Sequence, residues 1–250
     1  MAKENNPVWR RFLAPALEIL QKVRPPEGDF HPQGAWTHQY AVCLLNPERQ
    51  EKGEHPQPYG KLLLKRNPAE AGRFNLEVEQ SIFTRGRSGN RTRASLTCSS
   101  DRVASPLRWE LRSETLENGA AAGGASVSET GSVRDGMILR SGRGSRKIGA
   151  KRALTSNWSL IDAVQRLPFD AAQPLEFDMI EDLDLFKSGQ SLRPLGELTL
   201  ELGGRRTRLH GFRQIGRGIL PMHYLLDDQR RLIAATGSLR AIIWDTERKG

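Results

Sequence analysis

The sequence predicts a mainly all-β protein in which a large antiparallel sheet curls into a barrel or half-barrel. Three segments carry this prediction, because apolar and polar side chains alternate along each of them. Successive side chains of a strand point to opposite faces, so each segment has one apolar face and one wetted face, which is typical of antiparallel sheet with one solvated side. The apolar sides are Phe74, Leu76, Val78 and Ile82 in RFNLEVEQSIF; Leu107, Trp109 and Leu111 in LRWELRSE; and Leu198, Leu200 and Leu202 in GELTLELGG.

Further strand candidates extend this pattern over most of the chain after residue 30. Together with the first three they make about a dozen strands, and a twisted sheet of that size usually curls, splits or closes. Two breaks are expected: a polar loop with three prolines at 46–60, and a flexible, low-complexity hairpin tip at 116–126. The further candidates are 36–45, 60–66, 91–98, 126–133, 136–141, 174–180, 205–213, 218–226, 231–236 and 239–245.

Residues 1–30 are predicted to form a helical extension, and residues 31–250 a single β-barrel-like domain. Apolar residues recur at helical spacing between Trp9 and Val23, Pro15 interrupts the pattern, and two prolines follow it. Two interpretations stay open: a helix that binds a membrane surface or a partner, and a short helix packed against the main domain. We prefer the second.

One helix is expected in the middle of the chain, within TSNWSLIDAVQRLPFD. Ser159 and Asp162 have the spacing of a capping box, and Pro168 ends the helix. Leu160, Val164 and Leu167 line one side. Because this helix lies between two β halves, we expect it to plug or cover the open end of the curled sheet.

Composition limits the classes of function. The chain has 250 residues and a formal net charge of +9, which favours nucleic acid, anionic lipid or acidic polymer as a non-specific partner. Its two cysteines, Cys43 and Cys98, exclude a zinc site built on thiolates and leave open one disulfide or two free buried thiols, of which we prefer the thiols. No metal site and no cofactor are predicted.

The sequence leaves the compartment and the oligomeric state open. No stretch approaches the roughly 18 consecutive apolar residues of a spanning helix, so no membrane span is predicted. A clear signal peptide is also missing, which favours the cytoplasm. A periplasmic or cell-envelope location would follow if an export signal had been trimmed.

The stretch GFRQIGRGILPMHYLLDDQRRLIAA, residues 211–235, resembles a catalytic constellation at first sight. A hydrolytic triad would need a nucleophile on a sharp turn, and the sequence has no GxSxG. His223 and Asp227 lie on the same side of one strand but roughly 13 Å apart, too far to share a metal ion. We therefore interpret the stretch as two strands and a turn, in which the aspartates of DDQRR hydrogen-bond local backbone.

Carboxylates suggest one alternative function, a hydrolase acting on a polymer or sugar. Two carboxylates that flank a glycosidic bond would suffice for such a reaction. The spacing of an EF-hand is absent from the acidic segment FDMIEDLDLFKSGQ, and a solvated connection is its preferred interpretation. The catalytic candidates for this alternative are Asp101, Asp178, Glu181 and Asp184.

Basic residues suggest a second alternative, the binding of a polyanion by the loop at 140–152. Glycines among arginines can form a flexible loop that contacts phosphates. Aromatic side chains that would stack on bases are missing from this loop, so nucleic acid is disfavoured and a basic solvated rim is preferred. The candidate residues are Arg140, Arg143, Arg146 and Lys147.

A family resemblance rests on P-x-x-Y-x-x-D-x-x-x-R-L, carried by Pro221, Tyr224, Asp227, Arg231 and Leu232. Upstream stand CSSDRVASPLRWEL, WSLIDAVQRLP and GELTLEL. In this order the motifs resemble uncharacterised bacterial β-barrel proteins with a domain of unknown function, over about residues 34–245. The resemblance implies an antiparallel barrel or half-barrel, often associated with the cell envelope, without established catalysis.

The preferred hypothesis for function is a non-enzymatic β-barrel that binds an apolar or amphiphilic ligand, or a protein partner, inside its curl. Pockets with an apolar lining are typical ligand sites, whereas small barrels are often filled by their own side chains. Both outcomes are compatible with the pattern of the strands. The expected lining residues are Phe74, Leu76, Val78, Trp109, Leu111 and Tyr224.

Overall fold

The computed structural model describes residues 7–45, 57–85, 88–142 and 146–245. Fifteen strands form one sheet in the order β8-β7-β6-β5-β4-β3-β2-β1-β15-β14-β13-β12-β11-β10-β9. Neighbouring strands are antiparallel except β9 and β10, which pair in parallel. The sheet curls around itself, and within the described residues β8 and β9 form its two edges. The predicted class, a large curled antiparallel sheet, is therefore confirmed, and the curl stays open rather than closing strictly.

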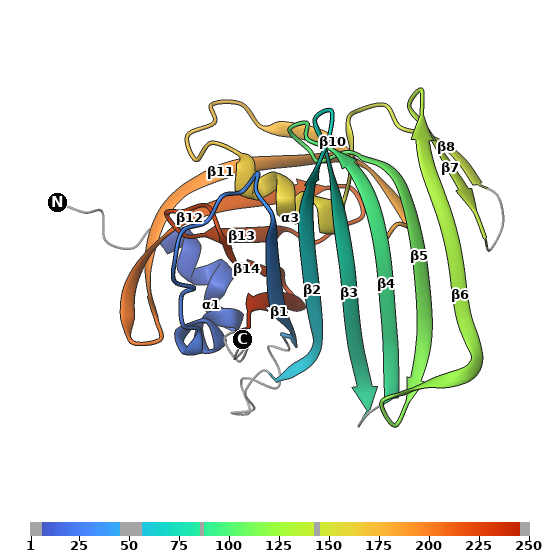
Figure 1. The fold of residues 1–250 in the computed structure, drawn as a ribbon. Coiled ribbons are helices and arrows are strands. Elements are labelled where there is room, and N and C mark those ends of the chain that lie inside the picture. The colour runs from blue at the N-terminus through green and yellow to red at the C-terminus, as the bar shows by residue number, and fades with distance from the viewer. Residues whose placement is uncertain (1–6, 46–56, 86–87, 143–145, 246–250) are drawn as a thin grey trace.

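Two groups of strands give the curl its shape. Figure 1 shows β2–β6 as a wall of long strands, with β11–β14 running across behind them. In the first half of the chain the strands are β1 (Trp36–Leu44), β2 (Pro58–Ala69), β3 (Arg73–Arg85), β4 (Ser88–Ser99), β5 (Pro106–Glu117), β6 (Ala120–Arg134), β7 (Met137–Ser141) and β8 (Arg146–Gly149). The second half contributes β9 (Leu154–Ser156), β10 (Leu175–Glu181), β11 (Leu185–Leu202), β12 (Arg205–Gly216), β13 (Met222–Leu226), β14 (Leu232–Thr236) and β15 (Arg240–Trp244).

The alternation of apolar and polar residues sets the inner face of the sheet, as predicted. Phe74, Leu76 and Val78 are buried on the inner side of β3, while Glu77 between them is exposed. On β5, Trp109 is buried against Gly131 of the neighbouring β6. A Cβ atom at Gly131 would lie 2.0 Å from the Trp109 ring, so glycine is required there for close packing.

Helix α3 (Asn157–Arg166) lies inside the curl, where the sequence places a plugging helix. Trp158, Leu160, Ile161 and Val164 are buried in the same core cluster as the inner faces of the strands. An apolar sheet face must be covered, and the side chains of this helix fill the interior of the curl behind the apolar residues of the strands.

A buried ion triad fixes α3 to the sheet. Asp162 has no exposed surface and accepts hydrogen bonds of 2.7 Å from Arg66 on β2 and of 2.7 Å from Arg166 one turn further along α3. Arg66 also donates to the carbonyl oxygens of Gln33 and Gly34. Both arginines therefore face the one buried carboxylate, and each also donates to backbone carbonyl oxygens, Arg166 to that of Ser100, which gives partners to charges that are costly to bury alone.

Helix α1 (Pro7–Lys22) covers the opposite, outer face of the sheet. Its buried side chains Leu13, Ala16 and Leu20 belong to a second core cluster, together with outward-facing residues of β1 and of β11–β15. The preferred prediction, a helix packed against the main domain, thus agrees with the contacts of α1. Among the described residues, no helix is both long and apolar enough to cross a membrane.

The two cysteines belong to different cores. Cys43 lies in the outer cluster and Cys98 in the inner one, and both are free and buried. The preferred interpretation of two buried thiols is confirmed.

Two local predictions about the helices are wrong. Ser156, not Ser159, caps α3: its side chain accepts from the Ser159 backbone, and the Ser159 side chain bonds back to Ser156. Helix α1 continues through Pro15. The hairpin predicted at 116–126 is present, with its turn at Asn118 and Gly119, both with positive φ, because Asn-Gly fits the two-residue turn whose twist matches the flanking strands.

His38 is the centre of a packed aromatic cluster at the start of β1. Its ring stacks on Trp36 at 4.4 Å between centroids and lies edge-on to Trp244, and its Nδ1 is 3.2 Å from the Tyr40 hydroxyl. Burial, and to a smaller extent the charge of Arg231, lower the pKa of His38 from 6.5 to about 3. The imidazole is therefore neutral in the folded protein at ordinary pH.

We expect replacement of Asp162 to destabilise the protein strongly. Asp162→Asn keeps the shape of the side chain but leaves Arg66 and Arg166 buried without a counter-ion, and breaking such a pair costs about 3–5 kcal/mol. Urea unfolding measures this loss. Asp170→Asn, at an exposed position after α3, is the control, and a loss no larger than the control's would contradict the role of the triad.

His38 should make the protein less stable in acid. The unfolded chain binds a proton below about pH 6.5, whereas the folded protein does so only near the lowered pKa of about 3. The free energy of unfolding therefore falls as the pH drops through this window, by up to about 1.4 kcal/mol per pH unit for this group. In His38→Gln the decrease from pH 6.5 to 5 should be smaller than in the wild type by about 2 kcal/mol. His31→Gln, at an exposed site, should match the wild type.

Candidate functional site

The inner face of the sheet changes from apolar to polar in one row of residues. On three neighbouring strands the row Val78, Ala94 and Leu111 is followed by Gln80, Thr92 and Ser113, which are paired across β3, β4 and β5. Because the strands are in register, the change occurs at the same level on each of them. The interior thus has an apolar part filled by α3 and a polar part beyond the start of α3.

A cavity of about 250 Å³ lies against this polar row. We call it the inner cavity. Trp158, at the start of α3, forms part of its wall, and its indole N–H is 3.4 Å from the Gln80 side-chain oxygen. The remaining lining comes from strands β3 to β7 and from the turn between β10 and β11: Gln80, Asn90, Thr92, Leu111, Ser113, Val127, Glu129, Arg140, Asp182 and Asp184.

Neutral donors and acceptors form one wall of the inner cavity. The Asn90 amide donates to Ser113 at 2.9 Å, and the Thr92 hydroxyl donates to Asn90 at 3.0 Å. The Thr92 and Ser113 hydroxyls are 3.2 Å apart. Hydroxyl and amide groups each both donate and accept, so this wall can match another hydroxylated molecule.

An arginine and two carboxylates form the opposite wall. Arg140 of β7 donates from Nε to Glu129 of β6 at 2.8 Å, and its other nitrogens bind Glu129 and both the side chain and the carbonyl oxygen of Asp184. Arg140 and Glu129 are only 6% and 7% exposed, which makes this a buried, bidentate pair. With one cation for two carboxylates, this wall has an excess of negative charge.

The turn that carries Asp182 and Asp184 has an unusual backbone. Asp182 and Leu183 both have positive φ, of 50° and 57°, a conformation that a bulky residue such as leucine rarely adopts. Asn157, the first residue of α3, holds the turn in place by accepting from the Asp182 N–H and donating to its carboxylate. Such strain is retained where the surroundings over-determine it, and it often accompanies functional sites.

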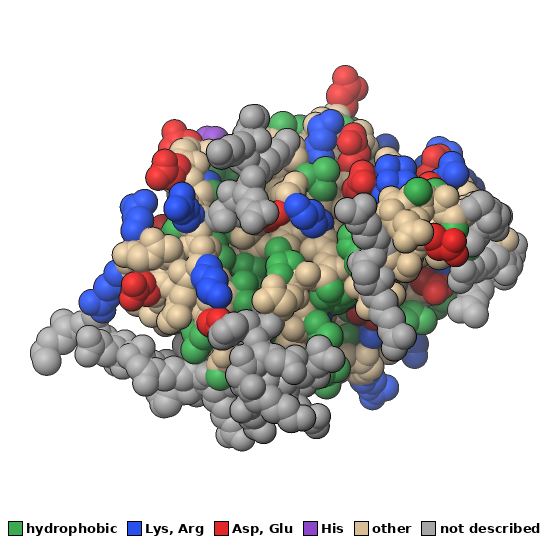
Figure 2. Space-filling model, turned by 90° about the horizontal axis from the view of Figure 1, so that it is seen from below, with side chains coloured by type: hydrophobic (Ala, Val, Ile, Leu, Met, Phe, Trp, Pro, Cys, Tyr) green, Lys and Arg blue, Asp and Glu red, His purple; other side chains and the backbone are tan. Residues whose placement is uncertain are grey.

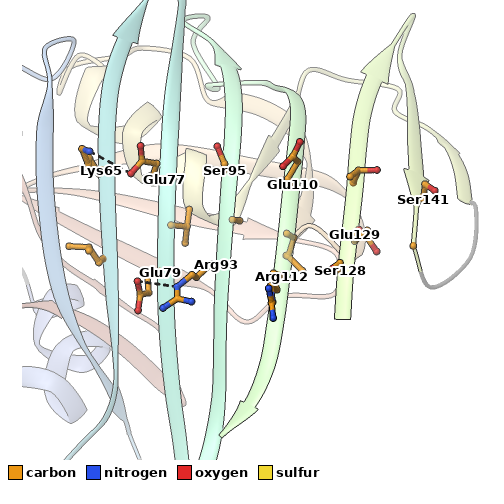
Figure 3. Close-up of a pocket in the computed structure, with 16 residues that line it drawn as sticks. Lys65, Glu77, Glu79, Arg93, Ser95, Glu110, Arg112, Ser128, Glu129 and Ser141 are labelled. Carbon is orange, nitrogen blue, oxygen red and sulfur yellow. Dashed lines mark hydrogen bonds and ion pairs between the residues drawn. The ribbon is translucent and has the colours of Figure 1, made fainter. Parts of the chain in front are cut away.

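A second, larger hollow of about 860 Å³ lies on the outer face of β2–β7. Figure 3 shows that its charged side chains come from adjacent strands and point toward one another. Lys65 is 3.6 Å from Glu77, and Arg93 is 3.4 Å from Glu79. These are cross-strand pairs on a solvated sheet face, where such pairs contribute little and are normal.

The predicted apolar lining lies inside the curl, but most of it is packed. Phe74, Leu76, Val78 and Trp109 are buried in the core around α3. Tyr224 is 5% exposed and donates to Gln214 at 2.7 Å. Of the six predicted residues, only Leu111 lines the inner cavity.

The four carboxylates suggested by the sequence do not converge. Asp178 is buried and accepts from the backbone N–H groups of Lys151, Arg152 and Gly189. Asp101 accepts from Val103 and Ser105 within its own turn, and Glu181 pairs with Lys187. Only Asp184 lines the inner cavity, where its partner is Arg140.

The predicted basic loop is also divided. Arg140 points into the curl rather than onto a basic surface, because Glu129 and Asp184 hold it there. Lys147 is exposed. Arg143 lies outside the described residues, and only the backbone of Arg146 is described, as the partner of Arg140 in the pairing of β7 with β8.

The segment 211–235 contains strands and a turn, as predicted. Asp227 accepts from the backbone N–H of Arg231 at 2.8 Å, which confirms its role in the turn. Asp228 differs from the prediction, because it binds Arg208 and His210 rather than local backbone. His223 is buried, and burial lowers its pKa to about 4.

Solved structures give the fold a known counterpart. The crystal structure of a β-barrel-like protein of domain of unknown function DUF1849 from Brucella abortus matches 85% of this chain and 96% of its own, with a TM-score of 0.55 and 6% sequence identity. This chain has the fold of an uncharacterised bacterial β-barrel protein. The resemblance inferred from the sequence motifs is thereby confirmed. No family model and no curated protein matches the sequence.

Sequence reasoning missed most residues of the inner cavity. A signal was present, because Gln80 interrupts the apolar series of Phe74, Leu76 and Val78 at the next inward position, and Ser113 does the same after Leu111. Only the register of the strands shows that Gln80 and Ser113 lie at the same level of the sheet, on either side of Thr92. The contributions of Glu129 and Trp158 depend on contacts far apart in sequence and have no comparable local signal.

The Glu129–Arg140 pair should be strongly coupled in a double-mutant cycle. Arg140→Met leaves Glu129 buried without its partner and should lower the free energy of unfolding by about 3–5 kcal/mol. Adding Glu129→Gln removes the unpaired charge and should restore a large part of this loss. Denaturant unfolding of the wild type, both single variants and the double variant measures the coupling, and additive losses would contradict a buried pair.

Proposed function

We propose that the protein is a non-enzymatic binding protein that holds the polar part of a small ligand in the inner cavity of its curl. The observation that carries the proposal is the simultaneous change from apolar to polar residues on β3, β4 and β5, beside an open volume of about 250 Å³. The polar groups of this row are only partly buried and hydrogen-bond one another, so their remaining donors and acceptors can face a molecule in the cavity.

The chemistry of the walls favours an uncharged, hydroxylated group. Asn90, Thr92 and Ser113 offer neutral hydrogen-bonding groups, and Trp158 offers an aromatic surface. Arg140 already forms ion pairs with Glu129 and Asp184. An anionic ligand at this wall would therefore meet two carboxylates, and the one arginine beside them is already paired. The volume is below the roughly 300–1,000 Å³ typical of drug-sized ligands, which fits a single small ring.

The expected hydrolase and polyanion functions receive less support. Asp101, Asp178 and Glu181 have structural partners, and Asp184 shares an arginine with Glu129 instead of facing a second carboxylate across a gap. Arg140 is buried within an ion pair, so the predicted basic cluster is incomplete. A wholly apolar ligand would compete with α3, which occupies the apolar part of the interior.

Neutral monosaccharides test the proposal. We expect D-glucose or a stereoisomer of it to raise the midpoint of thermal unfolding in a saturable way, since a ligand that binds only the folded state stabilises it by mass action. Glucuronate, of the same size but negatively charged, should bind more weakly. Thr92→Val, which removes the hydroxyl with little change in volume, should weaken the binding of glucose by about tenfold.

Thr199→Val, at an exposed position of β11 away from the cavity, is the matched control and should bind as the wild type does. The proposal fails if no neutral monosaccharide shifts the midpoint, or if Thr92→Val and Thr199→Val respond alike.

A further inference from the structure

Among the described residues, five large apolar side chains are exposed, and the four leucines among them lie along one rim of the sheet, whereas Ile215 lies on β12. The four leucines are Leu44, Leu185, Leu220 and Leu239, which are 49%, 55%, 52% and 57% exposed. We call them the leucine rim. Isolated exposed leucines need no explanation, but a concentration at one edge marks a binding surface.

The strand pairing places these leucines at one edge of the sheet: Leu44 at the end of β1, and the others in or next to the connections between neighbouring strands. Leu44 pairs with Arg240 at the end of β1, and the next residue, Leu45, donates to the carbonyl oxygen of Leu239 in the β14–β15 turn. That turn lies against the β12–β13 loop, which carries Leu220, because a Cβ atom at Gly237 would meet Met222 and Pro221.

The β10–β11 turn completes the rim. Lys187 of β11 donates to the carbonyl oxygen of Gly218 in the β12–β13 loop at 2.6 Å, which brings Leu185 beside that loop. Figure 2 shows the molecule from below, with hydrophobic side chains in the middle of the view and charged side chains nearer its outline.

The leucine rim meets the border of the inner cavity at the β10–β11 turn. Leu185 directly follows Asp184, which lines the cavity, and pairs with Glu181 next to Asp182. If the polar end of a molecule lay in the cavity, the rest of the molecule would leave the cavity beside Leu185 and could extend along the leucine rim.

We infer that the ligand is an amphiphile, with an uncharged polar head in the inner cavity and a hydrocarbon chain along the leucine rim. This inference rests on the proposed function, because it assigns the tail of the same ligand. Exposed apolar groups next to a polar cavity match the two ends of such a molecule, and covering them removes apolar surface from water. The open edge between β8 and β9 leaves the curl unclosed, so a chain need not be enclosed on all sides.

Octyl glucoside and glucose carry the same sugar group, so comparing them tests the tail site on the leucine rim separately from the polar site in the inner cavity. Isothermal titration calorimetry, below the concentration at which the detergent forms micelles, should show octyl glucoside binding about tenfold or more tightly than glucose, since each buried methylene adds to affinity. The double variant Leu185→Ser, Leu220→Ser should lose that gain and bind glucose as the wild type does. Both residues are more than half exposed, so the variant should fold.

Ile215→Ser is the matched control, because Ile215 lies on the opposite face of β12 from the buried Gln214 and does not belong to the rim. The Ile215→Ser variant should still bind octyl glucoside more tightly than glucose, as the wild type does. Equal affinities for octyl glucoside and glucose in the wild type would overturn the assignment of the tail and leave the polar site standing. Absence of binding by both compounds would overturn the polar site as well.

Discussion

The inner face of a fifteen-stranded sheet cannot remain bare, and α3 is the element that covers it. Without the helix, the aromatic and aliphatic side chains of β3, β5 and β10 would face water across an open curl. The helix is also fixed by charge, through Asp162 and its two arginines. Because a buried ion pair has a strongly preferred geometry, it sets the position of α3 more sharply than apolar contacts alone can. Trp158, which lines the inner cavity, lies on the same helix four residues before Asp162 and is therefore placed by the same contact.

Two helices cover opposite faces of one sheet and thereby define what is left open. Helix α1 covers the outer face of β1 and β11–β15, while α3 covers the inner face around β3, β5 and β10. The outer face of β2–β6 is left to solvent, which accounts for its ladders of Lys, Arg and Glu in Figure 3. The part of the inner face that α3 does not cover is also left without a covering helix. That remainder is small, concave and lined by specific hydrogen-bonding groups, which distinguishes it from the broad, charge-paired outer face.

The sequence predicts those features that depend on neighbours along the chain. The alternation of Phe74, Leu76 and Val78 is enough to give the strand and its inner face, and the apolar stripe of 157–166 is enough to give a buried helix. Features that depend on partners distant in sequence were not predictable. Arg140 looked like part of a basic surface loop because its partners, Glu129 and Asp184, are 11 and 44 positions away and reach it only after β6, β7 and β10 assemble. The capping residue was misplaced for a different reason: Ser156 and Ser159 are both serines, and the choice depends on where β9 ends.

Simple lengths explain why part of the interior is polar. Helix α3 has 10 residues and spans about 15 Å, and Figure 1 shows it lying across the direction of β3, whose 13 residues span about 40 Å, so α3 covers only part of the inner side of this strand. Where α3 does not cover the sheet, the row Gln80, Thr92 and Ser113 is polar, although the next inward residue of β3, Ile82, packs against the inner core again. A longer helix would have continued the core and removed the inner cavity. Instead the chain enters α3 through the capping box of Ser156 and fixes the first residue, Asn157, to the strained turn at Asp182. The end of the helix therefore sets both the end of the apolar core and the start of the polar cavity.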